Sequence, residues 1–106
     1  MTIHVFEPKH RVFTASDSPE LLYWVDSMLL PATTALVIDL SGIAFIDSSG
    51  IGALVIAHNR AKRINIKFIL CGLSEQVRMS LHLTGLMQVF EAYSTLAECE
   101  AALLPA

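Results

Sequence analysis

The sequence has no cluster of basic residues. It carries 7 Lys and Arg against 10 Asp and Glu, a formal net charge of −3 at pH 7, and its densest basic group is Arg60, Lys62 and Arg63. A nucleic-acid-binding surface needs a basic stripe along the phosphate backbone. The three cations instead lie late in a predicted helix, where they compensate the negative end of the helix dipole. Direct nucleic-acid binding is therefore not expected.

Cysteine and long apolar runs are also scarce. Cys71 and Cys99 lack CxxC spacing, so we expect reduced thiols rather than a disulfide framework. No secretory signal is expected, because Glu7 and Pro8 come before any apolar run. The apolar stretch over residues 28–40 is interrupted by a proline and an aspartate, which excludes a membrane span there. These features predict a soluble, cytoplasmic protein with no membrane partner.

The familiar catalytic and cofactor motifs are missing as well. Neither GxGxxG nor GxxxxGK[ST] occurs, and no GxSxG elbow or histidine at a suitable spacing accompanies a serine. The four histidines share no metal-ligand spacing: His4, His10, His58 and His82. Asp39 ends a predicted strand, but no acidic pair near the first strand could complete a metal site, so a structural role is expected for it. The sequence predicts no catalytic residue, no metal and no cofactor.

What the sequence does contain is apolar residues, which make up 54% of its 106 positions. This content and length predict one packed domain over residues 1–106. A small domain hides only part of its surface, so the apolar excess is also compatible with a homodimer.

Strand and helix patterns alternate along the chain. Short β-rich runs predict strands over residues 2–6, 11–14, 35–40, 67–71 and 86–90. Helical spacing predicts helices over residues 19–30, 51–62 and 75–84 and after residue 94, with N-caps at Asp17 or Ser18, at Ser74 and at Ser94. This order predicts an α/β domain with a mostly parallel or mixed sheet of four to five strands packed with about four helices.

A polar loop leads from residues 43–46 into the second predicted helix. It reads Asp47-Ser48-Ser49-Gly50-Ile51-Gly52. Aspartate and serine are good N-caps and glycine eases a turn, so a purely structural role explains the segment. A phosphoryl group on a serine here would also meet unpaired N–H groups at the positive end of the helix and add about −1.5 to −2 charge. The residues alone leave both interpretations open.

This loop and its surroundings resemble the STAS domain family, notably bacterial anti-sigma factor antagonists. The similarity covers about residues 35–104 and includes DLSG at 39–42, FIDSSGIG at 45–52, FILCG at 68–72 and LTGL at 83–86, followed by Phe90. The resemblance implies a STAS fold and identifies Ser48, directly after the aspartate, as the phosphorylated residue, with Ser49 as the second choice. It implies a partner-binding set of Asp17, Asp47, Ser48, Ser49, Gly50, Ile51 and Gly52.

The resemblance also implies the partners. In the family, an anti-sigma factor that is itself a serine kinase binds the unphosphorylated protein, which frees the sigma factor. Phosphorylation releases this partner, and a metal-dependent serine phosphatase resets the cycle. One segment departs from the family pattern, because Ala15-Ser16-Asp17 stands where a Gly-acidic-x-Asp segment is usual. Only Asp17 then matches, which leaves the choice of partner open.

A second interpretation is a constitutive STAS subunit of a transport-related or other signalling assembly. STAS domains in such assemblies often lack the Asp-Ser-Ser-Gly form, which favours the switch interpretation. In a constitutive subunit, complex formation would not depend on Ser48.

Overall fold

The computed structural model describes residues 2–104 of the chain. Its strands are β1 (Thr2–Phe6), β2 (Val12–Phe13), β3 (Thr33–Asp39), β4 (Phe45–Ile46), β5 (Lys67–Cys71) and β6 (Glu91–Tyr93). Its helices are α1 (Ser18–Met28), α2 (Ser48–Arg63), α3 (Glu75–Leu83) and α4 (Leu96–Leu103).

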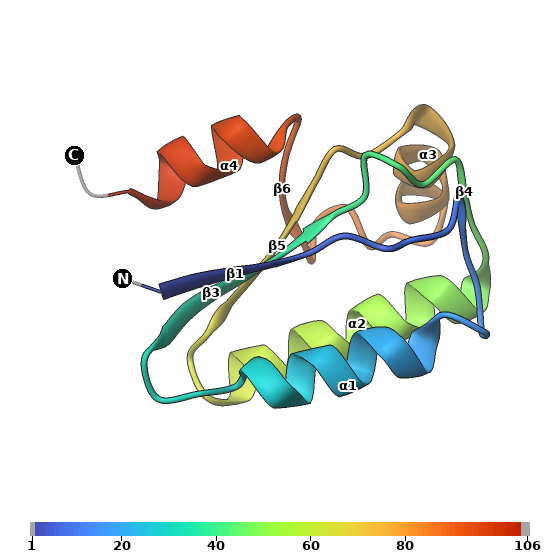
Figure 1. The fold of residues 1–106 in the computed structure, drawn as a ribbon. Coiled ribbons are helices and arrows are strands. Elements are labelled where there is room, and N and C mark those ends of the chain that lie inside the picture. Colours follow the sequence, from blue (N-terminus) through green and yellow to red (C-terminus); the bar gives the residue numbers. More distant parts are fainter. Residues whose placement is uncertain (1, 105–106) are drawn as a thin grey trace.

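The strands form two parallel sheets. The main sheet has the order β1-β3-β5-β6, and β2 pairs with β4 in a separate two-stranded sheet. Helices α1 and α2 lie side by side on one face of the main sheet, and α4 lies on the other face (Figure 1). Arg60 of α2 links the two neighbouring helices by donating to both carboxylate oxygens of Asp26 in α1, at 2.9 and 3.1 Å. The predicted α/β fold class is confirmed.

The central strands bury both of their faces. Alternate side chains of a strand point to opposite sides of the sheet, so Leu36 and Ile38 join the main core under α1 and α2. Val37 points the other way and packs in a smaller cluster with Cys71 and with Cys99 of α4. A parallel sheet covered by helices on both faces needs such continuous apolar strands. This explains the uninterrupted run that the sequence shows here.

The last strand lies outside its predicted range. Residues 86–90 form turns, in which the N–H groups of Val89 and Phe90 donate to the carbonyl of Leu86, and β6 follows only at Glu91–Tyr93. The predicted strand was wrong because these apolar side chains pack without joining the sheet. Phe90 is buried, with its ring centroid 5.5 Å from that of His58 and 6.3 Å from that of Phe68.

The observed N-caps and first residues of the helices differ in part from the predicted ones. Thr95, not Ser94, caps α4, since its hydroxyl accepts from the Glu98 N–H group at 3.1 Å. Asp17 occupies the N-cap position of α1, but its side chain makes no capping hydrogen bond. Helix α2 begins at Ser48, three residues before its predicted start, and the short strand β4 directly before it was not predicted. Ser74 caps α3 as predicted, with its hydroxyl accepting from Val77 N–H at 3.3 Å.

Membrane-spanning helices are absent from the part of the chain that the structure describes, since none there combines sufficient length with sufficient apolarity.

Two apolar residues of α2 test the assignment of its buried face. Leu54 is fully buried, whereas Ile56 is 44% exposed. We expect Leu54→Ala to lower the free energy of unfolding by about 2–5 kcal/mol through lost burial and a cavity. The matched variant Ile56→Ala should lower it by less than about 1 kcal/mol. Urea unfolding monitored by circular dichroism measures both, and equal losses would contradict this packing.

Candidate functional site

The small β2–β4 sheet carries the polar loop. Phe13 and Ile46 pair across it with buried side chains and anchor it to the core. The other pair of this sheet, Val12 and Phe45, is apolar yet 44% and 45% exposed. Strand β4 ends directly before Asp47, so an exposed apolar pair lies next to the loop. The sequence does not reveal this pair, because two residues are too few to show strand alternation.

Asp47 is a fully engaged N-cap. Its backbone is extended, and its Oδ1 atom accepts from the N–H group of Gly50 at 2.8 Å. Its own N–H group donates to the carbonyl of Phe13 at 3.3 Å, and its carbonyl accepts from the Ile51 N–H group at 3.0 Å. The structural interpretation of Asp47 is therefore confirmed. These bonds fix the direction in which α2 leaves the loop.

Ser48 and Ser49 occupy the first two positions of α2. Both are exposed, and neither hydroxyl makes a hydrogen bond within residues 2–104. Among the same residues their backbone N–H groups also lack acceptors, as expected for the first turn of a helix. The first turn holds no acidic side chain. This end of α2 thus combines an accessible hydroxyl with free donors and the positive end of the dipole, which together suit an anion.

Gly50 is held against β2 more closely than any side chain permits. A Cβ atom at this position would lie 2.3 Å from the carbonyl oxygen of Phe13 and 2.8 Å from Cγ1 of Ile46. At Gly52, one half-turn further, an added Cβ would meet nothing within 4 Å. Both glycines belong to the partner-binding set that the family resemblance implies. The structure gives only Gly50 a packing reason to be glycine.

Gln76 connects α3 to the same loop. Its Oε1 atom accepts from the Ile46 N–H group at 3.0 Å, and its Nε2 atom donates to the hydroxyl of Ser80 at 2.8 Å. This contact braces the residue just before Asp47. No sequence pattern indicated it, because the two partners are 30 positions apart.

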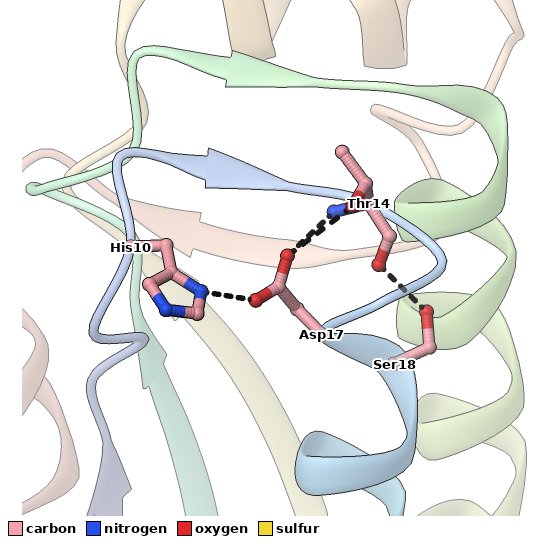
Figure 2. A network of polar contacts seen from close by, with 4 residues as sticks. All are labelled: His10, Thr14, Asp17 and Ser18. Atoms are coloured by element: carbon pink, nitrogen blue, oxygen red, sulfur yellow. Dashed lines mark hydrogen bonds and ion pairs between the residues drawn. The ribbon is translucent and has the colours of Figure 1, made fainter.

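Asp17 lies in the turn that follows β2, and its carboxylate is directed into that turn (Figure 2). Its Oδ1 atom lies 2.6 Å from Nδ1 of His10, and its Oδ2 atom accepts from the N–H group of Thr14 at 3.1 Å and from the Thr14 hydroxyl at 3.4 Å. The hydroxyl of Ser18 donates to the Thr14 carbonyl at 3.2 Å. The His10 hydrogen bond, followed by the backbone bond from Thr14, holds the pKa of Asp17 below its ordinary value.

The structure therefore brings six of the predicted site residues together at the start of α2, from Asp47 to Gly52. Asp17 belongs to an adjoining turn, since Thr14 directly follows Phe13, the residue that Asp47 and Gly50 contact. Within residues 2–104 its carboxylate is occupied by His10 and Thr14. A direct role of Asp17 in partner binding stays a prediction.

Other polar and thiol groups have structural surroundings. Asp39 accepts from the Ser41 N–H group at 3.0 Å, as its predicted structural role requires. Burial and the nearby Asp39 raise the pKa of Cys71 to about 12, and burial also raises the pKa of Cys99. Both thiols are thus protonated and inert at neutral pH. Within the described part of the chain, no three side chains of His, Cys, Asp or Glu form a cluster that could hold a metal ion.

Comparison with known proteins gives a match to the family model of the STAS domain over residues 4–99. A sulfate transporter family protein from Wolinella succinogenes superimposes with a TM-score of 0.83 at 15% identity, covering 94% of this chain and 83% of that one. A protein from Thermotoga maritima that is assigned as an anti-sigma factor antagonist gives 0.80 at 23% identity, covering 93% and 86%. An anti-sigma-factor antagonist (STAS) domain protein from Planctomyces limnophilus gives 0.77 at 26% identity, covering 89% and 81%.

The two glycines of the loop provide a stability test. We expect Gly50→Ala to lower the free energy of unfolding by about 1–3 kcal/mol, because the new methyl group overpacks against the Phe13 backbone. Gly52→Ala has open space and should instead raise the stability by about 0.5–1 kcal/mol through better helix propensity. Chemical denaturation measures both changes. A destabilisation by Gly52→Ala as large as that by Gly50→Ala would contradict the geometry of the loop.

The His10–Asp17 contact predicts a change in titration. His10→Ala removes the strongest cause of the lowered pKa, so the pKa of Asp17 should rise toward its ordinary value of 3.8. Because the folded-state pKa is depressed, Asp17 stabilises the fold above its ordinary pKa, and this contribution is lost as pH falls through the folded value. His10→Ala should therefore reduce the free energy of unfolding at neutral pH, but should not reduce it through Asp17 at a pH below the folded-state pKa of that residue.

Carboxyl NMR titration measures this shift directly. His82→Ala is the matched control, since His82 is an exposed histidine of α3 that makes no contact with Asp17. An unchanged Asp17 pKa in His10→Ala would mean that the two side chains do not interact in solution.

Proposed function

The chain belongs to the STAS domain family, and we propose that it is a non-catalytic binding protein of the anti-sigma factor antagonist type, controlled by phosphorylation of Ser48. The partner is an anti-sigma factor with serine kinase activity. It binds the unphosphorylated form and dissociates when Ser48 is phosphorylated. A metal-dependent serine phosphatase restores the binding form, and the cycle regulates transcription in the cytoplasm.

The observation that carries this proposal is the environment of Ser48. Its hydroxyl is exposed and makes no hydrogen bond within the described residues, so a kinase can reach it without unfolding the helix. Asp47 already caps α2 through Gly50, so Ser48 has no capping task that phosphorylation would disrupt. A serine that is free at a helix N-terminus is suited to modification. Ser49 is exposed too and is the second choice.

The proposed mechanism is a local change of charge. The uncharged side chains of Ser48 and Ser49 and the exposed Val12–Phe45 pair form a mixed apolar and polar surface that a partner can cover. A phosphoryl group would add about −1.5 to −2 charge at the edge of this surface, beside Asp47. Burying that charge unpaired in an interface is costly, so the partner dissociates. The free N–H groups and dipole of α2 favour the added charge, so the fold itself need not change.

The similar proteins support the antagonist type. One structure that resembles this chain is assigned as an anti-sigma factor antagonist, and the anti-sigma-factor antagonist (STAS) domain protein from Planctomyces limnophilus is 26% identical to it. The sulfate transporter family protein from Wolinella succinogenes supports a second candidate function. In that case the chain is a constitutive subunit of a transport-related assembly, bound in the same way whether or not Ser48 is modified.

Phosphosite mapping separates these candidates. We expect mass spectrometry of the protein recovered from its native cells to find a phosphoryl group on Ser48 in a fraction of the molecules. Ser48→Ala should abolish this modification, whereas Ser49→Ala, a matched change one residue further along α2, should retain it. No modification at either serine under growth and stress conditions would count against the switch and favour the constitutive subunit.

Partner capture with the same positions tests the charge mechanism. Ser48→Ala should retain the protein that copurifies with wild type, and Ser48→Asp should weaken its binding at least tenfold, or about 1.4 kcal/mol. Ser48 phosphorylated by the captured kinase is the stricter comparison, because a carboxylate carries less charge than a phosphate. If Ser48→Asp bound as tightly as wild type and the phosphorylated protein did so too, charge at Ser48 would not control the complex.

A further inference from the structure

Strand β1 forms one edge of the main sheet (Figure 1). It pairs with β3 on its inner side, and no strand within residues 2–104 pairs with its outer side. An edge strand presents a row of free N–H and C=O groups, which can pair with a strand of another chain. Natural proteins usually protect such edges with lysine, proline, inward-pointing charges or bulges.

The outer edge of β1 carries little of this protection. The strand reads TIHVF, without charge or proline, and Glu7 and Pro8 come only after its end. Its one register irregularity with β3 lies between Thr2 and Ile3, and the following residues pair regularly up to Phe6. Val5 is apolar yet 39% exposed. The strand is therefore uncharged, regular beyond Thr2 and at least partly exposed from Thr2 to Val5.

We propose that two copies of this chain pair through β1 as antiparallel strands about a twofold axis at His4, which joins the two main sheets into one of eight strands. Residues directly opposite each other in an antiparallel pair point to the same face of the sheet. With a twofold axis at His4, opposite residues are an even number of positions apart, so their side chains point to the same face. This axis also lets all 5 residues of β1 overlap with those of the second copy. It places Thr2 opposite Phe6 of the second copy and Ile3 opposite Val5.

This register provides cross-strand partners for the apolar residues of the edge strand. Ile3 packs with the α4-side cluster, and Val5 points to the same side by alternation, so the two apolar residues of each copy would form cross-strand pairs there. His4 points to the other face by alternation, where its own chain already encloses its Nε2 atom. Opposite residues have Cβ atoms about 4.5–5.5 Å apart.

The occupant is a second copy because the edge is complementary to itself. One sequence supplies the apolar cross-strand pairs on both sides of the axis, and the absence of charge in β1 means that no like charges meet. A foreign strand would have to supply all of these features independently. This inference does not rest on the proposed function, since β1 contributes no residue to the Ser48 loop.

Mass measurement and cross-linking test the dimer. We expect light scattering over a range of concentrations to give twice the 11.6 kDa of one chain at the upper end. Val5→Lys should return the mass to that of one chain, because it places a charge in the paired edge. Val12→Lys, a similarly exposed valine on β2, should leave the dimer intact. Circular dichroism checks that each variant is folded.

Cross-linking provides the measurement that does not depend on Val5→Lys folding. His4→Cys should form a disulfide-linked dimer under mild oxidation, since Cα atoms of directly opposite residues lie within the range a disulfide needs. Wild type should not do so, because Cys71 and Cys99 are buried, and Val12→Cys is the exposed control. A mass of one chain at every concentration would overturn the proposal. So would a dimer that survives Val5→Lys and gives no cross-link through His4→Cys.

Discussion

The close approach of Gly50 to the carbonyl of Phe13 is the constraint on which the candidate site depends. It holds the first turn of α2 against β2, where Asp47 can both donate to Phe13 and accept from Gly50. With the inner side of this turn pressed onto the backbone, its outer side has to carry Ser48 and Ser49. The turn that holds Asp17 starts one residue after Phe13 and is placed by the same contact. A side chain at position 50 would disturb all of these relations together.

The cap and the proposed switch use different residues of one helix end. A helix leaves its first N–H groups without acceptors, and Asp47 satisfies only that of Gly50. The donors of Ser48 and Ser49 are left for solvent or an anion. A loop with Asp47 but no adjacent serine would make an equally good cap, so capping alone does not account for the serine that follows it. Because Asp47 provides the cap and Ser48 would carry the phosphoryl group, a charge can be added to the surface while the start of α2 stays intact.

The parts of the structure that the sequence predicted rest on short-range patterns. The apolar runs of β3 and β5 and the Asp47 loop are contiguous in the chain, so period and capping rules located them. The missed features join distant residues: Gln76 meets Ile46 across 30 positions, and Phe90 is buried by His58 and Phe68 without entering the sheet. Asp17 or Ser18 was expected to cap α1. Asp17 occupies the N-cap position, but His10, seven positions earlier, binds its carboxylate. Local propensity could not anticipate these partners, because tertiary packing supplied them.

The parallel arrangement of the sheet also determines how a β1 pair would present the two Ser48 loops. The strands of the main sheet all run in one direction, and α2 starts beyond the carboxyl end of β3 (Figure 1). Antiparallel pairing reverses the second copy, so the two loops would lie toward opposite ends of the joined sheet. Each loop would then stay open to its own partner, and modification of one would leave the other unchanged. Such a dimer binds two partners independently, and it gains avidity only where those partners are themselves linked.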